Sequence, residues 1–173
     1  MLPLLSVLFT PVSSLNAVPQ DNIRSDGNGI LDLTEHDFSV DGTVKLNCKW
    51  EFFWNRLIEP GSKEWNETAS DHGFYSVPLF WTAYPGHSFP SVGYGTYRLI
   101  IKTNGKYQNL ALKTPEIFTE YRLWINGKIM DQHGTIAKTK TRFLKPAVYT
   151  FYTDSKKIEI VLQIKNSLHV SFP

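Results

Sequence analysis

Apolar and polar residues alternate most regularly in the segment YRLWI, residues 121–125. Its first, third and fifth side chains are apolar, which is the two-residue period of a strand with one buried face. Asn126-Gly127 follows directly, and this dipeptide after an alternating run is the strongest short-range indication of a β-hairpin. The sequence therefore predicts a hairpin whose core face excludes Arg122 and Trp124. Why a cation and a large aromatic ring lie on the opposite face is the first question that the pattern raises.

Shorter runs of the same period recur along the chain. Trp50, Phe52 and Trp54 share one face of a predicted strand, which indicates a core rich in aromatic side chains. After Trp54 the pattern allows one or two helical turns, which Pro60-Gly61 would stop, and no sustained helical period occurs anywhere. Short strands separated by turn residues predict a β-sandwich. The predicted strands are 30–33, 44–53, 97–102, 107–114, 121–125 and 156–166.

The composition supports this fold and narrows the partners. Hydrophobic residues make up 42% of the 173 residues and aromatic residues 14%, which is enough for a packed core. The formal charge is only +2, without a dense run of Lys or Arg, whereas a nucleic-acid-binding domain normally carries a basic stripe. We therefore expect no nucleic-acid partner. Cys48 is the only cysteine, which excludes an intramolecular disulfide, and we expect it to behave as a small buried apolar residue.

The first residues differ in character from the rest. A short apolar run at residues 2–9 is followed by small polar residues up to Ala17, as in a secretory signal cleaved after Ala17. No Lys or Arg precedes the run and prolines interrupt it, which leaves a leader without a targeting role as the alternative. The sequence thus predicts a signal peptide or leader at 1–17, a flexible lead-in at 18–28 and one domain at 29–173. The expected location is periplasmic or extracellular.

Residues that could carry chemistry are scattered. The acidic residues give no indication of a pair placed across a glycosidase cleft, and no nucleophile stands beside a base in the pattern. The five histidines have neither metal-ligand spacing nor a shared motif. We therefore expect a protein that is not an enzyme, with no catalytic residue, no cofactor and no metal ligand.

Binding of a small polyol, such as a sugar, fits the residue pattern better. Sugar sites combine an aromatic face with planar polar side chains that hydrogen-bond to hydroxyl groups. The candidate ligand-binding residues are Trp81, Tyr84, His87, Tyr94, Arg98, Trp124, Asn126 and His133. Each also has a structural interpretation. Trp81 could plug the sandwich edge, and Asn126 could serve only the turn. Arg98 could pair with Glu116 or Glu120.

Several blocks of sequence together resemble a known family. They are DLTEHDFSVDGTVKLNCKWEFFWNRLIEP, YSVPLFWTAY, GYGTYRLIIK, LALKTPEIFTEYRLWINGKIMDQHG and IEIVLQIKNSLH, within residues 29–169. In this range the chain resembles extracellular domain 2 of the bacterial 7TMR-DISM receptors (seven-transmembrane receptors with diverse intracellular signalling modules). The resemblance implies a jelly-roll β-sandwich, galactose-binding-domain-like, that senses a carbohydrate or another small molecule. It also implies a membrane-embedded signalling region in the parent or in a partner protein.

A second, weaker likeness is to the N-terminal sugar-binding jelly roll of β-galactosidases and β-glucuronidases. The shared elements are the VPxxW block at 77–81, Tyr97-Arg98, and the hairpin at 124–128. That domain is not the catalytic one, so this likeness also implies binding without catalysis. The receptors continue from a segment like NxxHxxGG into membrane helices, whereas this chain reads NSLHVSFP. We therefore expect either a sensor domain cut from a longer protein or a shortened relative that acts alone.

The sequence favours an extracytoplasmic ligand-binding sensor domain without catalysis. A rival hypothesis is a protein–protein interaction module that docks another domain on the face around Trp124, which predicts an exposed apolar patch there. A third hypothesis is the non-catalytic sugar-binding jelly roll of a glycoside hydrolase. The resemblance to the receptor family assigns no ligand-contacting residue to a position of this chain, so the candidate residues rest on their chemistry alone.

Overall fold

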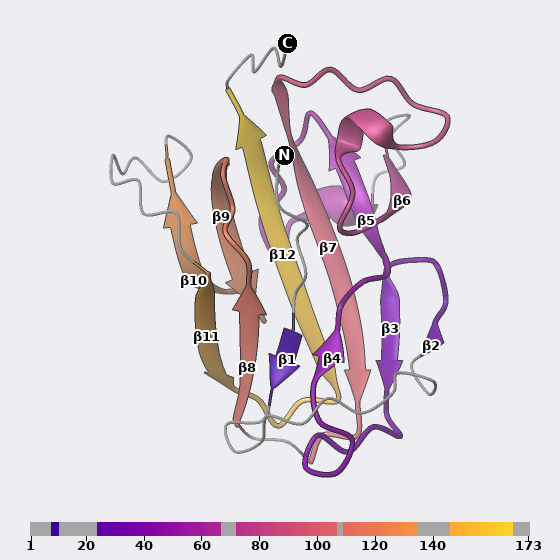
Figure 1. The fold of residues 1–173 in the computed structure, drawn as a ribbon, viewed down its shortest axis with the longest axis vertical. Helices are drawn as coiled ribbons and strands as arrows, with labels where there is room; N and C mark the ends of the chain where they lie inside the picture. Colours follow the sequence, from indigo (N-terminus) through magenta and orange to yellow (C-terminus); the bar gives the residue numbers. More distant parts are fainter. Residues whose placement is uncertain (1–7, 11–23, 67–71, 107–108, 135–145, 168–173) are drawn as a thin grey trace.

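Two β-sheets face each other across an apolar core (Figure 1). The computed structural model describes residues 8–10, 24–66, 72–106, 109–134 and 146–167. Within these segments the helical elements are two short 3-10 helices, η1 (Lys63–Asn66) and η2 (Trp81–Ala83). The all-β jelly-roll sandwich expected from the sequence is therefore confirmed. No helix of the described segments is long and apolar enough to cross a bilayer.

The smaller sheet has four strands and lies in front in Figure 1. Its order is β11 (Ala147–Tyr152), β8 (Asn109–Thr114), β1 (Leu8–Thr10) and β4 (Val44–Lys45). Every neighbouring pair is antiparallel. Since β1 pairs with both β8 and β4, it joins two strands that are far apart in the sequence.

The larger sheet has eight strands and lies behind the smaller one (Figure 1). Its main path is β10 (Lys128–His133), β9 (Glu120–Ile125), β12 (Lys157–Asn166), β7 (Gly93–Thr103), β3 (Ile30–Leu33) and β2 (Arg24–Ser25). On one side β7 has two partners, because its first half pairs with β5 (Lys49–Trp54) and its second half with β3. Strand β6 (His72–Ser76) extends the sheet beyond β5.

The hairpin predicted from Asn126-Gly127 is confirmed. Ile125 pairs with Lys128 across the turn, so β9 and β10 are joined by two residues. Asn126 has a φ of 49° and Gly127 a φ of 76°. Two consecutive left-handed residues define the turn type that matches strand twist, and Asn and Gly adopt this conformation at the least steric cost.

The single strand predicted at 44–53 is split. Val44–Lys45 belongs to the smaller sheet as β4, and Lys49–Trp54 belongs to the larger sheet as β5. At the corner between them, the indole Nε1 of Trp50 donates a hydrogen bond to the Leu46 carbonyl at 3.1 Å. Apolar residues continue through the corner because both strands face the same core, so alternation alone does not show the change of sheet.

The core lies between the two sheets and is rich in aromatic rings, as predicted. Trp50 and Phe52 are fully buried, and Trp54 packs against the same cluster. The Phe52 ring is surrounded by aromatic neighbours at centroid distances of 4.4 to 6.5 Å. In the same sheet, on the far side of β7, the inward side chains Ile158, Ile160 and Leu162 of β12 are buried as the alternation predicts.

Two structural findings concern the predicted leader and the predicted lead-in at the N-terminus. Residues 18–23 of the predicted lead-in lie outside the described residues, whereas Arg24–Ser25 form β2 and pair with β3. The strand β1, Leu8–Thr10, lies within the predicted leader and is hydrogen-bonded on both sides. Cleavage after Ala17 would therefore remove a strand from the middle of the smaller sheet.

Candidate functional site

Trp81 and Tyr84 are core residues at one end of the sandwich. Their exposed fractions are 8% and 2%. The Trp81 Nε1 donates to the Pro90 carbonyl at 2.9 Å, and the hydroxyl groups of Tyr84 and Tyr97 are hydrogen-bonded at 3.0 Å. Burial raises the pKa of Tyr84 to about 12 and that of Tyr97 well above its ordinary value. Neither Trp81 nor Tyr84 presents a ring face to a ligand in solution.

His87 and Tyr94 lie near the same end. The His87 ring is exposed and stacks on Phe89 with centroids 5.0 Å apart. Tyr94 is half-buried, and its carbonyl accepts a hydrogen bond from the Asn55 N–H at 2.9 Å. Of these two candidates and the pair above, His87 alone is exposed to solvent.

Arg98 and Trp124 lie on the outer face of the larger sheet, meaning the face turned away from the core. Strand register places the outward side chains of β5, β7, β12 and β9 in rows. One row is Phe53, Thr96, Gln163 and Arg122, and the next is Glu51, Arg98, Val161 and Trp124. This face therefore carries both apolar and charged side chains, and two of the charged ones are arginines.

Residues 55–66, which we call the strap, cross this outer face. In Figure 1 the purple strap passes behind β12 and β7, on the side away from β8. Ile58 is fully buried and its N–H donates to Thr96 Oγ1 at 3.0 Å. Further along, the Glu59 carboxylate lies 3.2 Å from Arg122 Nη1. The strap thus spans from β7 to β9 across the row that contains Gln163.

The strap answers the question raised by Arg122 and Trp124. Trp124 is only 4% exposed, and the Arg122 guanidinium lies 5.5 Å from its ring. Trp124 itself is therefore not part of an exposed apolar patch, and docking of another domain on the surrounding face stays a prediction. A helical turn does form in this region, but it is η1, which follows Pro60-Gly61 instead of preceding it.

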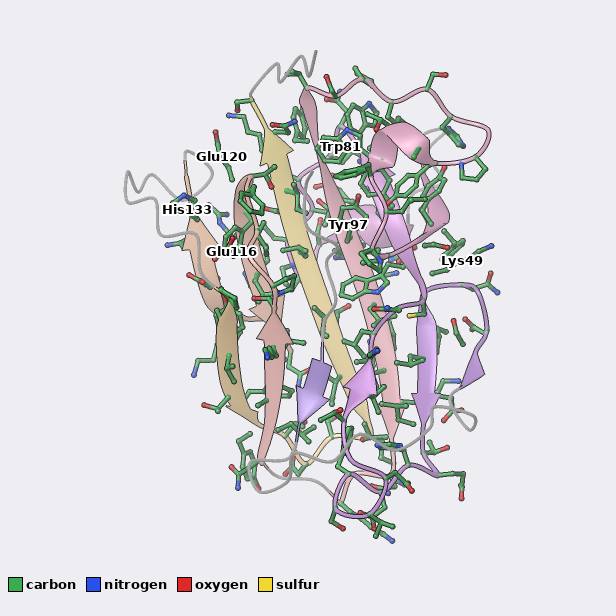
Figure 2. The ribbon with its side chains drawn as sticks, in the orientation of Figure 1. Lys49, Trp81, Tyr97, Glu116, Glu120 and His133 are labelled. Atoms are coloured by element: carbon green, nitrogen blue, oxygen red, sulfur yellow. The ribbon has the colours of Figure 1, made fainter. Side chains whose placement is uncertain are left out.

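Arg98 is the centre of an ion-pair network on the outer face. It donates to Glu51, which also contacts His72 at 3.0 Å. Its Nη1 lies 3.9 Å from Glu159, and the Trp65 ring of the strap lies 4.3 Å from its guanidinium carbon. Its partners are thus Glu51 and Glu159. Glu116 and Glu120, the partners considered from the sequence, lie beyond β12 on the other side of the view in Figure 2.

His133 lies at the opposite side of the sandwich from Trp81 and Tyr97 (Figure 2). It is half-buried, with its ring 6.2 Å from that of Tyr121. Beside it, a β-bulge turns Asp131 toward the second sheet, where its carboxylate accepts hydrogen bonds from Tyr121 and Tyr149. Burial and these bonds to Asp131 raise the pKa of Tyr149 to about 12. This cluster links β9 and β10 of the larger sheet to β11 of the smaller sheet.

Asn126 is the candidate that lies in a pocket. The pocket has a volume of about 380 Å³ and is formed where the β9–β10 turn meets the β11–β12 turn. Its lining residues are Asn126, Tyr152, Thr153, Asp154, Ser155, Lys157 and Glu159. The volume lies at the lower end of the range for small-molecule sites.

The base of the pocket is held rigidly by Asn126. Its Oδ1 accepts the Glu159 N–H at 2.9 Å, and its Nδ2 donates to Thr153 Oγ1 at 3.4 Å. Its own N–H donates to the Glu159 carbonyl at 2.9 Å. These bonds fix the hairpin turn against β12, so Asn126 positions the pocket wall.

The rim of the pocket offers groups for a ligand. Tyr152 is 61% exposed and ends β11 with its side chain outward. Among the described residues, the side chains of Asp154 and Lys157 have no hydrogen-bond or ion-pair partner. An exposed aromatic ring beside a carboxylate and an ammonium group can stack on an apolar ring face and bond to hydroxyl groups.

The structure therefore distributes the eight candidates over separate regions. Trp81, Tyr84, His87 and Tyr94 lie at one end, Arg98 and Trp124 under the strap, His133 at the open side and Asn126 in the pocket. Sequence reasoning missed Tyr152, Asp154 and Lys157. A usable signal was present, because the alternating segment AVYTFY ends on an outward aromatic and the polar turn TDSKK follows.

Comparisons with known proteins assign neither a family nor a function to this chain. No protein-family model matches this sequence, and no curated protein matches it. Among solved structures, the chain is similar to a β-glucuronidase of Faecalibacterium prausnitzii, with 12% identity and a TM-score of 0.46. The similarity covers 70% of this chain and 20% of that one, so the chain spans about a fifth of the length of that enzyme. A likeness at this level does not extend to activity or ligand.

Proposed function

We propose that this protein is an extracytoplasmic sensor domain that binds a carbohydrate or another small polyol and catalyses no reaction. The observation that carries the proposal is the pocket between the β9–β10 and β11–β12 turns. There the exposed Tyr152 stands beside Asp154 and Lys157, whose side chains have no hydrogen-bond or ion-pair partner in the part of the chain that the structure describes.

The chemistry of the pocket suits a polyol. A sugar ring has an apolar face that can lie on the Tyr152 ring, and its hydroxyl groups both donate and accept hydrogen bonds. Asp154 and Glu159 supply acceptors, and Lys157 supplies donors. Because Asn126 already fixes the turn, the wall needs little ordering when the ligand binds, which favours affinity.

The sensor role rests on other support. The sequence blocks within residues 29–169 resemble the extracellular domain of bacterial membrane receptors, and the run at residues 2–9 resembles a secretory signal. In this proposal the bound ligand shifts the contacts of the domain with a membrane-embedded signalling region. The non-catalytic jelly roll of a glycoside hydrolase remains the alternative context for the same binding activity.

Calorimetric titration of the full chain with a panel of mono- and oligosaccharides tests the binding function. We expect Tyr152→Ala to weaken the binding of any sugar found by about tenfold, which is about 1.4 kcal/mol. Tyr152→Phe should keep most of the affinity because the ring face remains. Val148→Ala is the matched control, since Val148 is 60% exposed on the outward side of the same strand.

Two outcomes would contradict the proposal. One is the absence of binding to every sugar in the panel. The other is a bound sugar whose affinity is lowered equally by Tyr152→Ala and Val148→Ala. Fractionation of the source cells tests the location separately, because it shows whether the protein lies outside the cytoplasmic membrane.

A further inference from the structure

We propose that the strap is a displaceable lid over a second binding site, which takes an acidic sugar on the outer face of the larger sheet. This site lies on a different face from the pocket and goes beyond the function proposed above. It is made by Arg122 and Gln163 in one row and by Trp124 in the next. The Glu59 carboxylate of the strap stands where the carboxylate of the ligand would lie.

The first argument is the chemistry of the covered face. Arg122 already binds one carboxylate, that of Glu59, at 3.2 Å. Gln163, directly opposite Arg122 on β12, is 1% exposed, and its Nε2 has no hydrogen-bond acceptor among the described residues. A buried amide N–H without an acceptor is rare and indicates a missing partner. A ligand oxygen placed beside Arg122 would supply it.

The second argument is the aromatic surface next to these donors. Trp124 is two residues from Arg122 on β9, so both side chains point to the same face. The guanidinium of Arg122 lies 5.5 Å from the Trp124 ring. A planar cation beside an indole is an arrangement that accepts a sugar ring carrying a carboxylate. Trp124 was also a candidate ligand-binding residue in the sequence.

The third argument is that the strap buries few apolar side chains, although it is bonded both to itself and to the sheet. Its contacts with the sheet include Arg56 and Ile58 with Thr96, Glu59 with Arg122, and Trp65 with Phe53 and Arg98. Internal contacts are Arg56 with Glu64, Ser62 with Glu64, and the Trp65 Nε1 with the Glu59 carbonyl. Ile58 is the only strap residue that is fully buried. The ion pair of Glu59 with Arg122 is exposed on the side of Glu59, and exposed ion pairs contribute little to stability.

A segment of this kind can open without unfolding the sandwich. Few buried apolar contacts and exposed hydrogen bonds characterise regions that open locally at low free-energy cost. The ligand carboxylate would exchange with Glu59 on Arg122, so charge is conserved at the site. The contact of Glu59 with Arg122 is therefore an autoinhibitory contact in this proposal.

The test uses the full chain and two substitutions of equal charge change. Glu59→Gln removes the competing carboxylate, and Glu35→Gln removes an exposed carboxylate that has no described partner. Binding of galacturonate and glucuronate is measured by calorimetry, with galactose and glucose as neutral counterparts. We expect Glu59→Gln to raise the affinity for an acidic sugar at least fivefold over the unsubstituted chain, and Glu35→Gln to leave it unchanged.

Hydrogen exchange in the Tyr152→Ala chain, whose pocket is impaired, supplies an independent readout. Binding should increase amide exchange in residues 55–66, and Gln163→Leu, which keeps the bulk of the side chain but not its N–H, should lower the affinity at least fivefold. Tyr152→Ala should leave this binding unchanged, which distinguishes it from binding in the pocket. The proposal is overturned if neither acidic sugar binds Glu59→Gln, if neutral sugars bind equally well, or if exchange in the strap does not change.

Discussion

At the scale of single residues, the turn residue Asn126 shows how a candidate for binding is also required by the fold. Its φ of 49° is strained for most side chains, and its amide makes bonds to Glu159 and Thr153. The local pattern predicts the turn because Asn and Gly favour this conformation. It does not predict the bonds to β12, since these join residues 33 positions apart in sequence.

Substitutions at Asn126 separate these contributions. We expect Asn126→Ala to lower the free energy of unfolding by about 2–3 kcal/mol, because it loses two hydrogen bonds and places a Cβ in the left-handed region. Asn126→Gly should cost less, and Asn126→Asp least, since Asp keeps the acceptor for the Glu159 N–H. Urea unfolding at neutral pH gives the order, and an equal cost for Ala and Asp would contradict this account.

The buried pair Tyr84 and Tyr97 predicts a loss of stability in alkali. The folded pKa of Tyr84 is about 12, above its ordinary value of 10, so the unfolded chain releases the proton first. The stabilisation is complete below pH 10 and is lost as pH rises from 10 towards 12. The free energy of unfolding should fall by roughly 1 kcal/mol by pH 11 on account of Tyr84.

Replacing both tyrosines tests that assignment. The double substitution Tyr84→Phe and Tyr97→Phe removes both hydroxyl groups together and leaves neither one unpaired. Urea unfolding at pH 8, 10 and 11 should then show a smaller decrease than in the unsubstituted chain. Some decrease should remain, because Tyr121 and Tyr149 also have raised pKa values. An identical decrease in both proteins would show that the buried pair does not carry the effect.

At the scale of elements, alternation identified strands but not the sheets to which they belong. The inward side chains of β12 and β9 are buried as predicted, because a two-residue period directly records a sheet with one apolar face. The corner between β4 and β5 escaped prediction, since both strands supply apolar residues to a shared core. The strap was not predicted either, because Ile58 is its one buried residue and a single apolar position gives no repeating pattern.

Strand β1 gives the clearest prediction at this scale. It pairs with β8 on one side and with β4 on the other, so its removal leaves two strand edges unpaired. We expect a chain of residues 18–173 to be less stable than the full chain by about 2 kcal/mol, from the loss of several backbone hydrogen bonds. Hydrogen exchange should rise in β8 at the positions that face β1.

A chain that lacks only residues 1–7 is the matched control, because it retains β1. If the chain of residues 18–173 and this control have equal unfolding free energies, β1 does not contribute to the stability of the sheet. Intact mass of the protein isolated from its source cells then decides whether the leader is removed. Retention of residues 8–10 would show that they serve as a strand, whereas their loss would leave the slot between β4 and β8 open for another strand.

At the scale of the whole molecule, the pocket and the strap are linked by one residue. Glu159 lines the pocket, and its Oε1 lies 3.9 Å from Arg98 Nη1. Arg98 in turn lies under the Trp65 ring of the strap. The pocket combines side chains from two turns brought together by pairing of β9 with β12. Local sequence patterns could therefore indicate the residues of one turn, but neither their meeting with Asn126 nor the link to the strap.

This link predicts that a ligand in the pocket changes the strap. A ligand that draws the Glu159 carboxylate into its own hydrogen bonds weakens the contact with Arg98, and the stacking of Trp65 on Arg98 should weaken with it. We expect sugar binding to increase hydrogen exchange in residues 55–66 about two- to fivefold.

Glu159→Gln should keep the binding through Tyr152 and abolish the change in the strap, since a neutral amide attracts Arg98 less. Val148→Ala, on the outward face of β11, should preserve both. An equal increase in strap exchange in Glu159→Gln and in the unsubstituted chain would contradict this account. The effect of the ligand would then reach the strap by another route than the contact of Glu159 with Arg98.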